Sequence, residues 1–261
     1  MSGAIYTATS GALAYQMRLD VLSNNLSNMG TVGFKEDRTV FRAYLPASQD
    51  PISENLQTTL MSEEPTTLES YQISNSLVAF EGTRTDFSPG QLKQTGNAFD
   101  LAIDGNGFFC IQTPDGVQYT RKGNFTLNHE GVLANQEGLP VLGNGGTIKF
   151  TDGKDFVVDK EGNISIDGEE IDTLKIVNFT APHSLEKVGN TLFAPTGPGI
   201  TEEKAEGFGI NQGFIELSNV NAIRVMLEMI EVLRGYESYK KVIQSVDDVT
   251  SKAINEVGHL A

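Results

Sequence analysis

The segment DKEGNISIDGEE, residues 159–170, places oxygen-bearing side chains at the positions that bind calcium in a twelve-residue calcium loop. Its sixth position is Ile164, whereas the sharp turn of such a loop requires a glycine there. Ile164 and Ile166 alternate with polar residues, as in a half-buried strand. The sequence therefore predicts a β-hairpin in this segment and no metal site.

The side chains that most often perform catalysis or bind metals are scarce in this chain. Its histidines are His129, His183 and His259, and its only cysteine is Cys110. No histidine has a second ligand at metal-site spacing, and Cys110 has no histidine near it in sequence. Cys110 lies in the apolar run GFFCIQ and is expected to be a small buried strand residue. We predict no catalytic residue, no metal and no cofactor.

Two further signals of chemistry are weak. The glycine-rich strings at 143–146 and 207–213 lack the spacing and context of phosphate-binding loops and are expected to be turns. The 34 acidic residues allow many carboxylate pairs of the kind that hydrolyse glycosides, but no tryptophan is present to form a sugar platform. A carbohydrate enzyme or binder, oligomerised by helices, is the alternative from a second functional class.

The net charge of −15 lies entirely in the middle of the chain. Residues 1–45 carry four basic and three acidic groups, and residues 218–261 carry five basic and six acidic groups. The acidic middle disfavours nucleic acid and anionic lipid as partners. No stretch reaches the roughly 18 apolar residues of a transmembrane helix, and the first residues lack the basic and apolar regions of a secretory signal.

Both ends of the chain carry a first row of apolar residues at alternating spacings of three and four, which is typical of a heptad helix. The row spans three repeats at the amino end and five at the carboxyl end, where Thr250 is the one polar interruption. The sequence therefore predicts two long helices that pair as a coiled coil. The rows consist of Ile5, Ala8, Ala12, Tyr15, Leu19, Leu22 and Leu26, and of Val225, Met229, Val232, Tyr236, Tyr239, Ile243, Val246, Ala253, Val257 and Leu260.

A second apolar row accompanies the first on each helix. One partner helix cannot cover both rows, so the remaining surface is expected to bind copies or relatives of the same chain. Two ordinary amphipathic helices on a globular core are the simpler alternative. In a dilute monomer the ends are expected to fray, because a helix gets most of its stability from packing. The second rows are Leu13, Met17 and Val21, and Ile223, Leu227, Ile230 and Leu233.

Short alternating runs such as DLAIDG, GFFCIQ, NISID and LKIVNF, separated by turn signals, fill the region from residue 76 to 204. A glycine after aspartate or asparagine favours the type I′ turn of a hairpin. The pattern predicts an antiparallel all-β domain inserted between the two helices, with residues 46–75 as an irregular connector. The predicted turns include Asp104-Gly105, Asp115-Gly116, Asn144-Gly145, Asp152-Gly153 and Asp167-Gly168.

The first helix is expected to stop within SNNLSNMGTVGFK, residues 23–35. Asparagine and serine side chains compete for backbone hydrogen bonds, and asparagine tolerates the left-handed conformation. Gly30 and Gly33 complete the stop, and Phe34 anchors the departing strand. The asparagines that could also bridge to a neighbouring helix are Asn24, Asn25 and Asn28.

NNLSN followed shortly by GFK resembles the hallmark of the bacterial flagellar rod and hook family of axial proteins. Further matching strings follow in the family's order, so the resemblance covers nearly the whole chain and weakens only across 46–75. They are DLAIDGNGFF (100–109), YTRKGNFTLNHEGVL (119–133), GNTLFAP (189–195) and INQGFIELSNVNAIRVMLEMIEVLRGYESYKKVIQSVDD (210–248).

The resemblance implies an inner tube of paired terminal helices, a joining segment after GFK and an outer β domain. It also implies export through the flagellum's own secretion channel, without a cleaved signal peptide, into the periplasm-spanning rod. The end strings SGAIYTATSGA and YESYKKVIQSVDD resemble the proximal-rod type more than the distal-rod type. Arg224 and Val225 depart from the family, whose members more often carry acidic residues after SNVN.

The predicted fold class is α+β. Residues 1–36 and 218–261 are expected to form the helical coiled-coil domain, 37–75 and 205–217 a connecting extended segment, and 76–204 the β-rich outer domain. The expected function is that of a non-enzymatic structural subunit of the flagellar basal-body rod, in its proximal part, which assembles helically and transmits torque. A distal-rod subunit is the alternative within the family.

The expected partners are copies of the chain itself, other rod subunits and the flagellar export apparatus, without nucleic acid, small-molecule substrate or membrane span. The residues expected to carry assembly are Leu19, Leu22, Leu26, Asn24, Asn25, Asn28, Gly33, Phe34, Val225, Met229, Val232, Tyr236 and Ile243.

Overall fold

A computed structural model describes residues 2–44, 77–150, 155–180, 185–189, 191–196 and 200–258. The contacts within the chain divide it into two compact units, which are described separately. The first comprises residues 1–22, 39–83 and 227–261, and the second comprises residues 23–38 and 84–226. The predictions that lie outside the described residues are the connector at 46–75, the turn Asp152-Gly153, His183, His259, Leu260 and the side chains of Ala253 and Val257.

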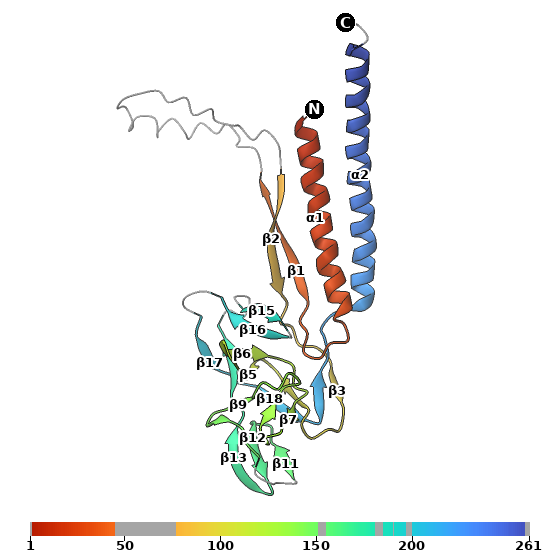
Figure 1. Cartoon of the computed structure of the whole chain (residues 1–261). Coiled ribbons are helices and arrows are strands. Elements are labelled where there is room, and N and C mark those ends of the chain that lie inside the picture. The colour runs from red at the N-terminus through yellow and green to blue at the C-terminus, as the bar shows by residue number, and fades with distance from the viewer. Residues whose placement is uncertain are drawn as a thin grey trace, which may run out of the picture. The chain divides into compact units, whose positions relative to one another are not determined.

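The two long helices predicted at the ends are present. Helix α1 (Ser2–Ser27) has 26 residues and α2 (Ala222–Gly258) has 37, and in the first unit they lie side by side (Figure 1). Asn221 caps α2, because its side-chain oxygen accepts a hydrogen bond from the backbone N of Arg224 at 3.1 Å. At the other junction α1 ends as predicted, with the Asn28 side-chain amide donating to the carbonyl of Asn24 at 2.9 Å.

The largest sheet is antiparallel and has six strands in the order β15-β16-β6-β5-β14-β17. An antiparallel sheet of three strands, β11-β12-β13, lies in the same unit. The bounds in the first sheet are β5 (Phe108–Thr113), β6 (Gly116–Thr120), β14 (Ile176–Phe179), β15 (Leu185–Gly189), β16 (Leu192–Pro195) and β17 (Glu202–Lys204), and in the second β11 (Phe156–Val158), β12 (Asn163–Ile166) and β13 (Glu169–Thr173).

The remaining strands pair two by two. In the second unit β3 pairs with β19, β4 with β18, β7 with β8 and β9 with β10, each antiparallel, while β1 pairs with β2. Their bounds are β1 (Asp37–Tyr44), β2 (Leu77–Thr85), β3 (Leu92–Gln94), β4 (Leu101–Asp104), β7 (Thr126–Leu127), β8 (Leu133–Ala134), β9 (Leu142–Gly143), β10 (Gly146–Thr147), β18 (Gly209–Gln212) and β19 (Phe214–Glu216).

The six-stranded sheet is covered on both faces, as β5 shows. Successive side chains of a strand point to opposite faces. Phe109 and Ile111 belong to one buried cluster and Phe108 and Cys110 to another. Cys110 is therefore the buried strand residue predicted, and burial raises the pKa of its thiol to about 12.

The hairpin predicted within residues 159–170 is confirmed. Ile166 pairs with Glu169, so Asp167 and Gly168 form the two-residue turn, with φ of 51° and 86°. Both values are positive, as a type I′ turn requires. The glycine string at 143–146 also turns at Asn144-Gly145, because Gly143 pairs with Gly146.

Other turn predictions need correction. The turn between β5 and β6 consists of Pro114 and Asp115, because Thr113 pairs with Gly116, and the sequence had placed it one residue later. The string at 207–213 is not a turn throughout. Its residues Gly209–Gln212 form β18, because Ile210 is buried in the core and holds this segment in register with β4.

The α+β class is confirmed, with the antiparallel β region between the two helices in sequence. Strand pairing reaches beyond 76–204 into the predicted connecting segment, where β18 and β19 lie. The predicted domain boundaries themselves stay a prediction. Across the described residues, no helix is long and apolar enough to cross a membrane.

Candidate assembly interface

The first apolar row of each helix is its better-buried side. Ala8, Leu22, Val225 and Val232 are buried, the last at 1% exposure. The remaining predicted interface residues of these rows are half-buried; they are Leu19, Leu26, Met229, Tyr236 and Ile243. The described residues of the first row of each helix are thus buried or half-buried already within one chain, as expected for a packed helix face.

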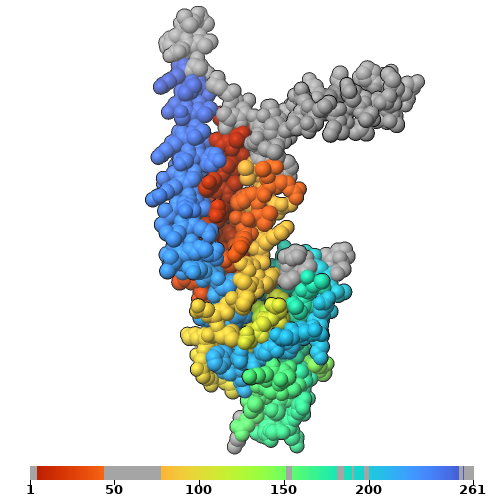
Figure 2. Space-filling view, turned by 180° about the vertical axis from the view of Figure 1, so that it is seen from behind, coloured from red at the N-terminus to blue at the C-terminus, as the bar shows by residue number. Residues whose placement is uncertain are grey.

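The helices of the first unit contact each other directly. The rings of Tyr15 and Tyr239 lie 5.6 Å apart between centroids, and Arg18 forms an ion pair of 3.5 Å with Glu228. Since the higher-numbered residue of α1 meets the lower-numbered residue of α2, the helices run antiparallel. Figure 2 shows α2 in blue against α1 in red.

Most of the second apolar row is exposed on both helices. With 3.6 residues per turn, Leu227 and Ile230 lie on the side of α2 opposite Val232, and they are 59% and 47% exposed. On α1, Leu13 and Met17 are exposed and Val21 is half-buried. Large exposed apolar surfaces of this kind mark interaction sites. The row on α2 also includes the exposed Ile223 and Leu233.

The asparagines at the end of α1 are used within their own chain. Asn25 is fully buried and clamps Asp37, donating to its carbonyl at 2.8 Å and accepting from its backbone N at 2.9 Å. The side-chain oxygen of Asn28 accepts a hydrogen bond from the Thr31 hydroxyl at 3.2 Å. Asn24 has an exposed side chain. The clamp at Asn25 therefore fixes the path of the chain from α1 into β1.

Gly33 and Phe34 anchor the turn that follows. Gly33 has a φ of 69° and donates its backbone N–H to the carbonyl of Glu216 at 2.8 Å. A Cβ at Gly33 would lie 2.4 Å from the backbone N of Lys122, so only glycine fits this close approach. Phe34 is buried, with the ammonium of Lys187 4.0 Å from its ring centroid.

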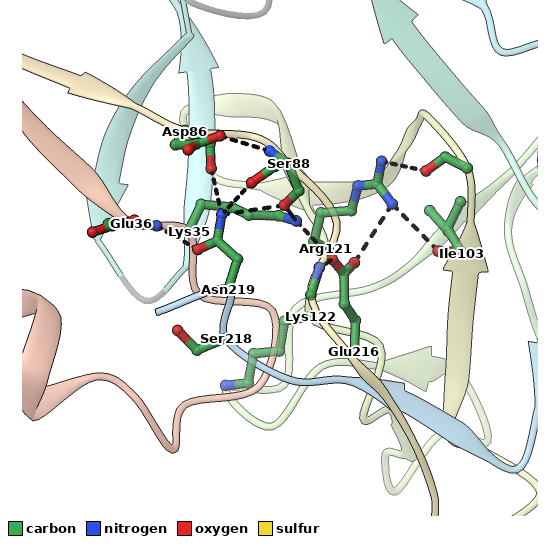
Figure 3. A network of polar contacts seen from close by, with 12 residues as sticks. Lys35, Glu36, Asp86, Ser88, Ile103, Arg121, Lys122, Glu216, Ser218 and Asn219 are labelled. Carbon is green, nitrogen blue, oxygen red and sulfur yellow. Dashed lines mark hydrogen bonds and ion pairs between the residues drawn. The ribbon is translucent and has the colours of Figure 1, made fainter. Parts of the chain in front are cut away.

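The lysine of GFK enters a buried charge cluster that the sequence did not predict (Figure 3). Lys35 and Glu216 are each 1% exposed and are joined by an ion pair of 2.6 Å. The Lys35 ammonium also donates to the carbonyl of Ser88 at 2.7 Å, and Gly90 donates its backbone N–H to Glu216 at 2.7 Å. The buried Arg121 lies 3.5 Å from the other carboxylate oxygen.

Burial dominates the electrostatics of this cluster. It lowers the pKa of Lys35 although the Glu216 carboxylate acts against that shift, and it lowers the pKa of Arg121 in the same way. Arg121 also donates to the backbone carbonyl of Gly105 at 2.8 Å. The cluster joins the segment after α1 to β19 and to the loop before β3, so it sets where that segment lies within the second unit, residues 23–38 and 84–226 (the β unit).

Arg224 in the first turn of α2 and Asn219 just before this helix both bind Glu36, in the segment that follows α1. Arg224 pairs with Glu36 at 2.6 Å, and the Asn219 side chain accepts from the backbone N of Glu36 at 2.8 Å while donating to the carbonyl of Asp86. The arginine that departs from the family pattern thus has an acidic partner in its own chain. The partners are 188 residues apart in sequence, so no local pattern could reveal them.

The chain is similar to known proteins along nearly its whole length. The rod protein FlgG of Bacillus subtilis is 35% identical to it, over 98% of this chain and 99% of the relative. The chain belongs to the flagellar basal-body rod protein family. The rod protein FlgF of Caulobacter vibrioides is 29% identical to the chain over the full length of both proteins. The hook-basal body complex protein FlhO of Bacillus subtilis is also 29% identical to it over the full length of both.

Three family models match successive parts of this rod-family chain. The model for flagella basal body rod proteins matches residues 5–35, and the one for the D1 domain of flagellar hook protein FlgE/F/G matches 102–166. The model for the C-terminal part of basal body rod FlgEFG proteins matches 211–256. The first and third contain most of the two helices together with Lys35 and Glu216, and the D1 model contains Arg121. Family membership makes the chain a structural protein of the flagellar basal body, not an enzyme.

Proposed function

We propose that this rod-family protein is a subunit of the periplasmic flagellar rod and assembles helically with copies of itself and with other rod subunits through its terminal helices. The two helices pair as a coiled coil, and their second rows pack against neighbouring subunits. The protein reaches the rod through the flagellar export channel. Assembled in this way it transmits torque as part of the drive shaft.

One observation carries the proposal: each helix has apolar residues on opposite sides. Val232 of α2 is buried, whereas Ile230 and Leu233 on other sides of the same helix are exposed. Burying one such large side chain contributes about 1.5–3 kcal/mol. Several per subunit, repeated along a lattice, would make a stiff assembly, and a lone subunit cannot cover them.

The end strings of the sequence favour the proximal part of the rod, and the distal part is the alternative. Position along the shaft is measurable with a tagged copy in purified basal bodies. A tag near the inner end of the shaft supports the proximal position, whereas a tag near the hook end supports the distal one.

Deletion of residues 221–261 in cells that lack the native copy tests the assembly itself. We expect the remaining β unit to stay folded and the protein to disappear from basal bodies, with loss of swimming. Normal swimming with this truncation would contradict the proposal. Retention of the β-unit fold is checked by its resistance to protease.

A point substitution separates the second row from the helix as a whole. Ile230→Glu is expected to reduce the copies found in basal bodies at least about tenfold, because it places a charge in a surface that packing would bury. Ser238→Glu adds the same charge to an exposed polar position of α2 and serves as the matched control. Equal incorporation of the two variants would show that the second row is not an interface.

A further inference from the structure

Two glycines in the middle of the terminal helices lie directly under tyrosine rings of the opposite helix. A Cβ at Gly11 of α1 would be 2.5 Å from Cε1 of Tyr239, and a Cβ at Gly235 of α2 would be 2.3 Å from Cε1 of Tyr15. Both distances are shorter than any real carbon contact. Each tyrosine therefore occupies the space that a side chain on the facing glycine would need.

The arrangement is reciprocal. Each helix carries its glycine four residues before its tyrosine, which is about one helical turn. Because the helices run antiparallel, Gly11 meets Tyr239 at the same stagger at which Tyr15 meets Gly235. The two rings also contact each other, with centroids 5.6 Å apart and planes tilted by 46°. Each ring is therefore packed between the facing glycine and the other ring.

Glycine is a costly choice at these positions. It is among the poorest helix formers, and alanine would favour both helices if they were solvated. The structure supplies the reason for glycine, since the methyl group of an alanine would overlap the facing tyrosine ring. Glycine at 11 and 235 therefore serves the contact between the helices and not the stability of either helix alone.

The apolar heptads alone do not define the register of the two helices, because a slip by seven residues also brings one apolar row against the other. Such a slip would move the helices by about 10 Å and place Tyr15 opposite Glu228 or Val242. No glycine would then lie under either ring. The ion pair between Arg18 and Glu228 agrees with the observed register but is partly exposed and adds little.

We propose that these four residues form a reciprocal glycine–tyrosine clasp that locks the stagger of α1 and α2, and that this stagger makes the helix pair competent to join a second copy of the chain. The inference rests on the proposed function, because it assumes assembly through the second rows. A fixed stagger places Leu13 and Met17 of α1 at one defined level relative to Leu227, Ile230 and Leu233 of α2. Every subunit of a helical lattice must present these residues identically.

Exchanging the partners of the clasp tests it in cells that lack the native copy. We expect Gly235→Ala to lower the copies per basal body at least about tenfold, since overpacking a tight contact costs enough for that. Adding Tyr15→Leu should recover at least half of the wild-type amount, because it removes the ring that faces residue 235 while Gly11 and Tyr239 still fix the stagger. Adding Tyr239→Leu instead should give no recovery.

The other half of the clasp must behave as the mirror image. Gly11→Ala should be rescued by Tyr239→Leu and not by Tyr15→Leu. Undiminished incorporation of both alanine variants, or rescue by either leucine indiscriminately, would overturn the clasp. Failure of the proposed function is distinguishable, because the wild-type chain would then be missing from basal bodies as well.

Discussion

Lys35, Glu216 and Arg121 form a buried group of charges that the protein maintains at a cost. Removing charges from water is unfavourable, and such a group is stable only if each charge has partners. Here the partners are one another and backbone groups of Ser88 and Gly90. A buried charge group adds little stability relative to an apolar core, but it strongly disfavours any arrangement that separates its members.

Replacing Lys35 by methionine should lower the free energy of unfolding by about 3 kcal/mol, because Glu216 would lose its closest countercharge while staying buried. Urea unfolding of the full chain measures this. Lys122→Met is the matched control, since Lys122 pairs with the partly exposed Glu137 at 3.2 Å and should cost less than about 1 kcal/mol. Similar losses in the two variants would contradict the role given to burial.

Glu202 gives the β unit a dependence on acid pH. Partial burial would raise the pKa of its carboxyl, but hydrogen bonds from Tyr119 and Lys175 outweigh this and hold that pKa below its ordinary value of 4.5. A lowered carboxyl pKa stabilises the fold at pH values above 4.5, and that contribution is lost as the pH falls through the folded-state pKa.

Glu202→Gln should therefore reduce the loss of stability between pH 7 and pH 3. The urea midpoint of the variant, compared at the two pH values with that of wild type, measures the change. Glu130→Gln, which removes the negative charge of an exposed carboxyl, is the matched control. An identical pH dependence in wild type and Glu202→Gln would show that this carboxyl is not linked to folding.

The turn that links α1 to β1 is a structural element with one strict requirement. Gly33 has positive φ and packs against the backbone at Lys122, whereas Gly30, three residues earlier, has open space around it. The sequence shows both glycines as equal parts of a helix stop. Only the packing of the β unit distinguishes them.

Gly33→Ala should destabilise the second unit by about 3 kcal/mol, combining the strain of a positive φ with overpacking against backbone. Gly30→Ala should change the unfolding free energy by less than about 0.5 kcal/mol. Denaturant unfolding followed by tyrosine fluorescence reports both values. A neutral Gly33→Ala would mean that the turn moves freely away from Lys122.

For the molecule as a whole, apolar side chains are more exposed on the terminal helices than in the β unit. The second unit has two buried clusters with residues such as Phe109 and Phe193 at 0% exposure, while α2 in the first unit leaves Leu227 59% exposed. A helix that lacks partners for its apolar side has little to hold it when diluted. The terminal helices are thus expected to depend on neighbours in a way that the β unit does not.

Limited proteolysis of the dilute chain should cut first within the helical parts of the first unit, residues 1–22 and 227–261, and leave the second unit, residues 23–38 and 84–226, intact. The same ends should resist cleavage in purified basal bodies, where neighbours cover them. Mass spectrometry of the fragments locates the cuts. Early cleavage within β5 or β6, with intact ends, would contradict this distribution of stability.

The elements that have a local period could be predicted from the amino-acid sequence. Heptad spacing located both helices, two-residue alternation located β5 and β12, and the turn residues located Asp167-Gly168, because each depends on neighbours within a few positions. The family could be predicted as well, from ordered strings along the chain. The end of α1 followed from the same local reasoning on asparagine and glycine.

The long-range pairings could not be predicted in this way and are visible only in the folded chain. Lys35 and Glu216 are 181 residues apart, and Gly235 is marked as a contact site only by the ring of Tyr15 that packs against it. A charge or a glycine has no periodicity that names its partner, so the contact exists only once strands and helices from both ends of the chain have been brought together. Local spacing specifies what each segment can form, and packing specifies which side chains then meet.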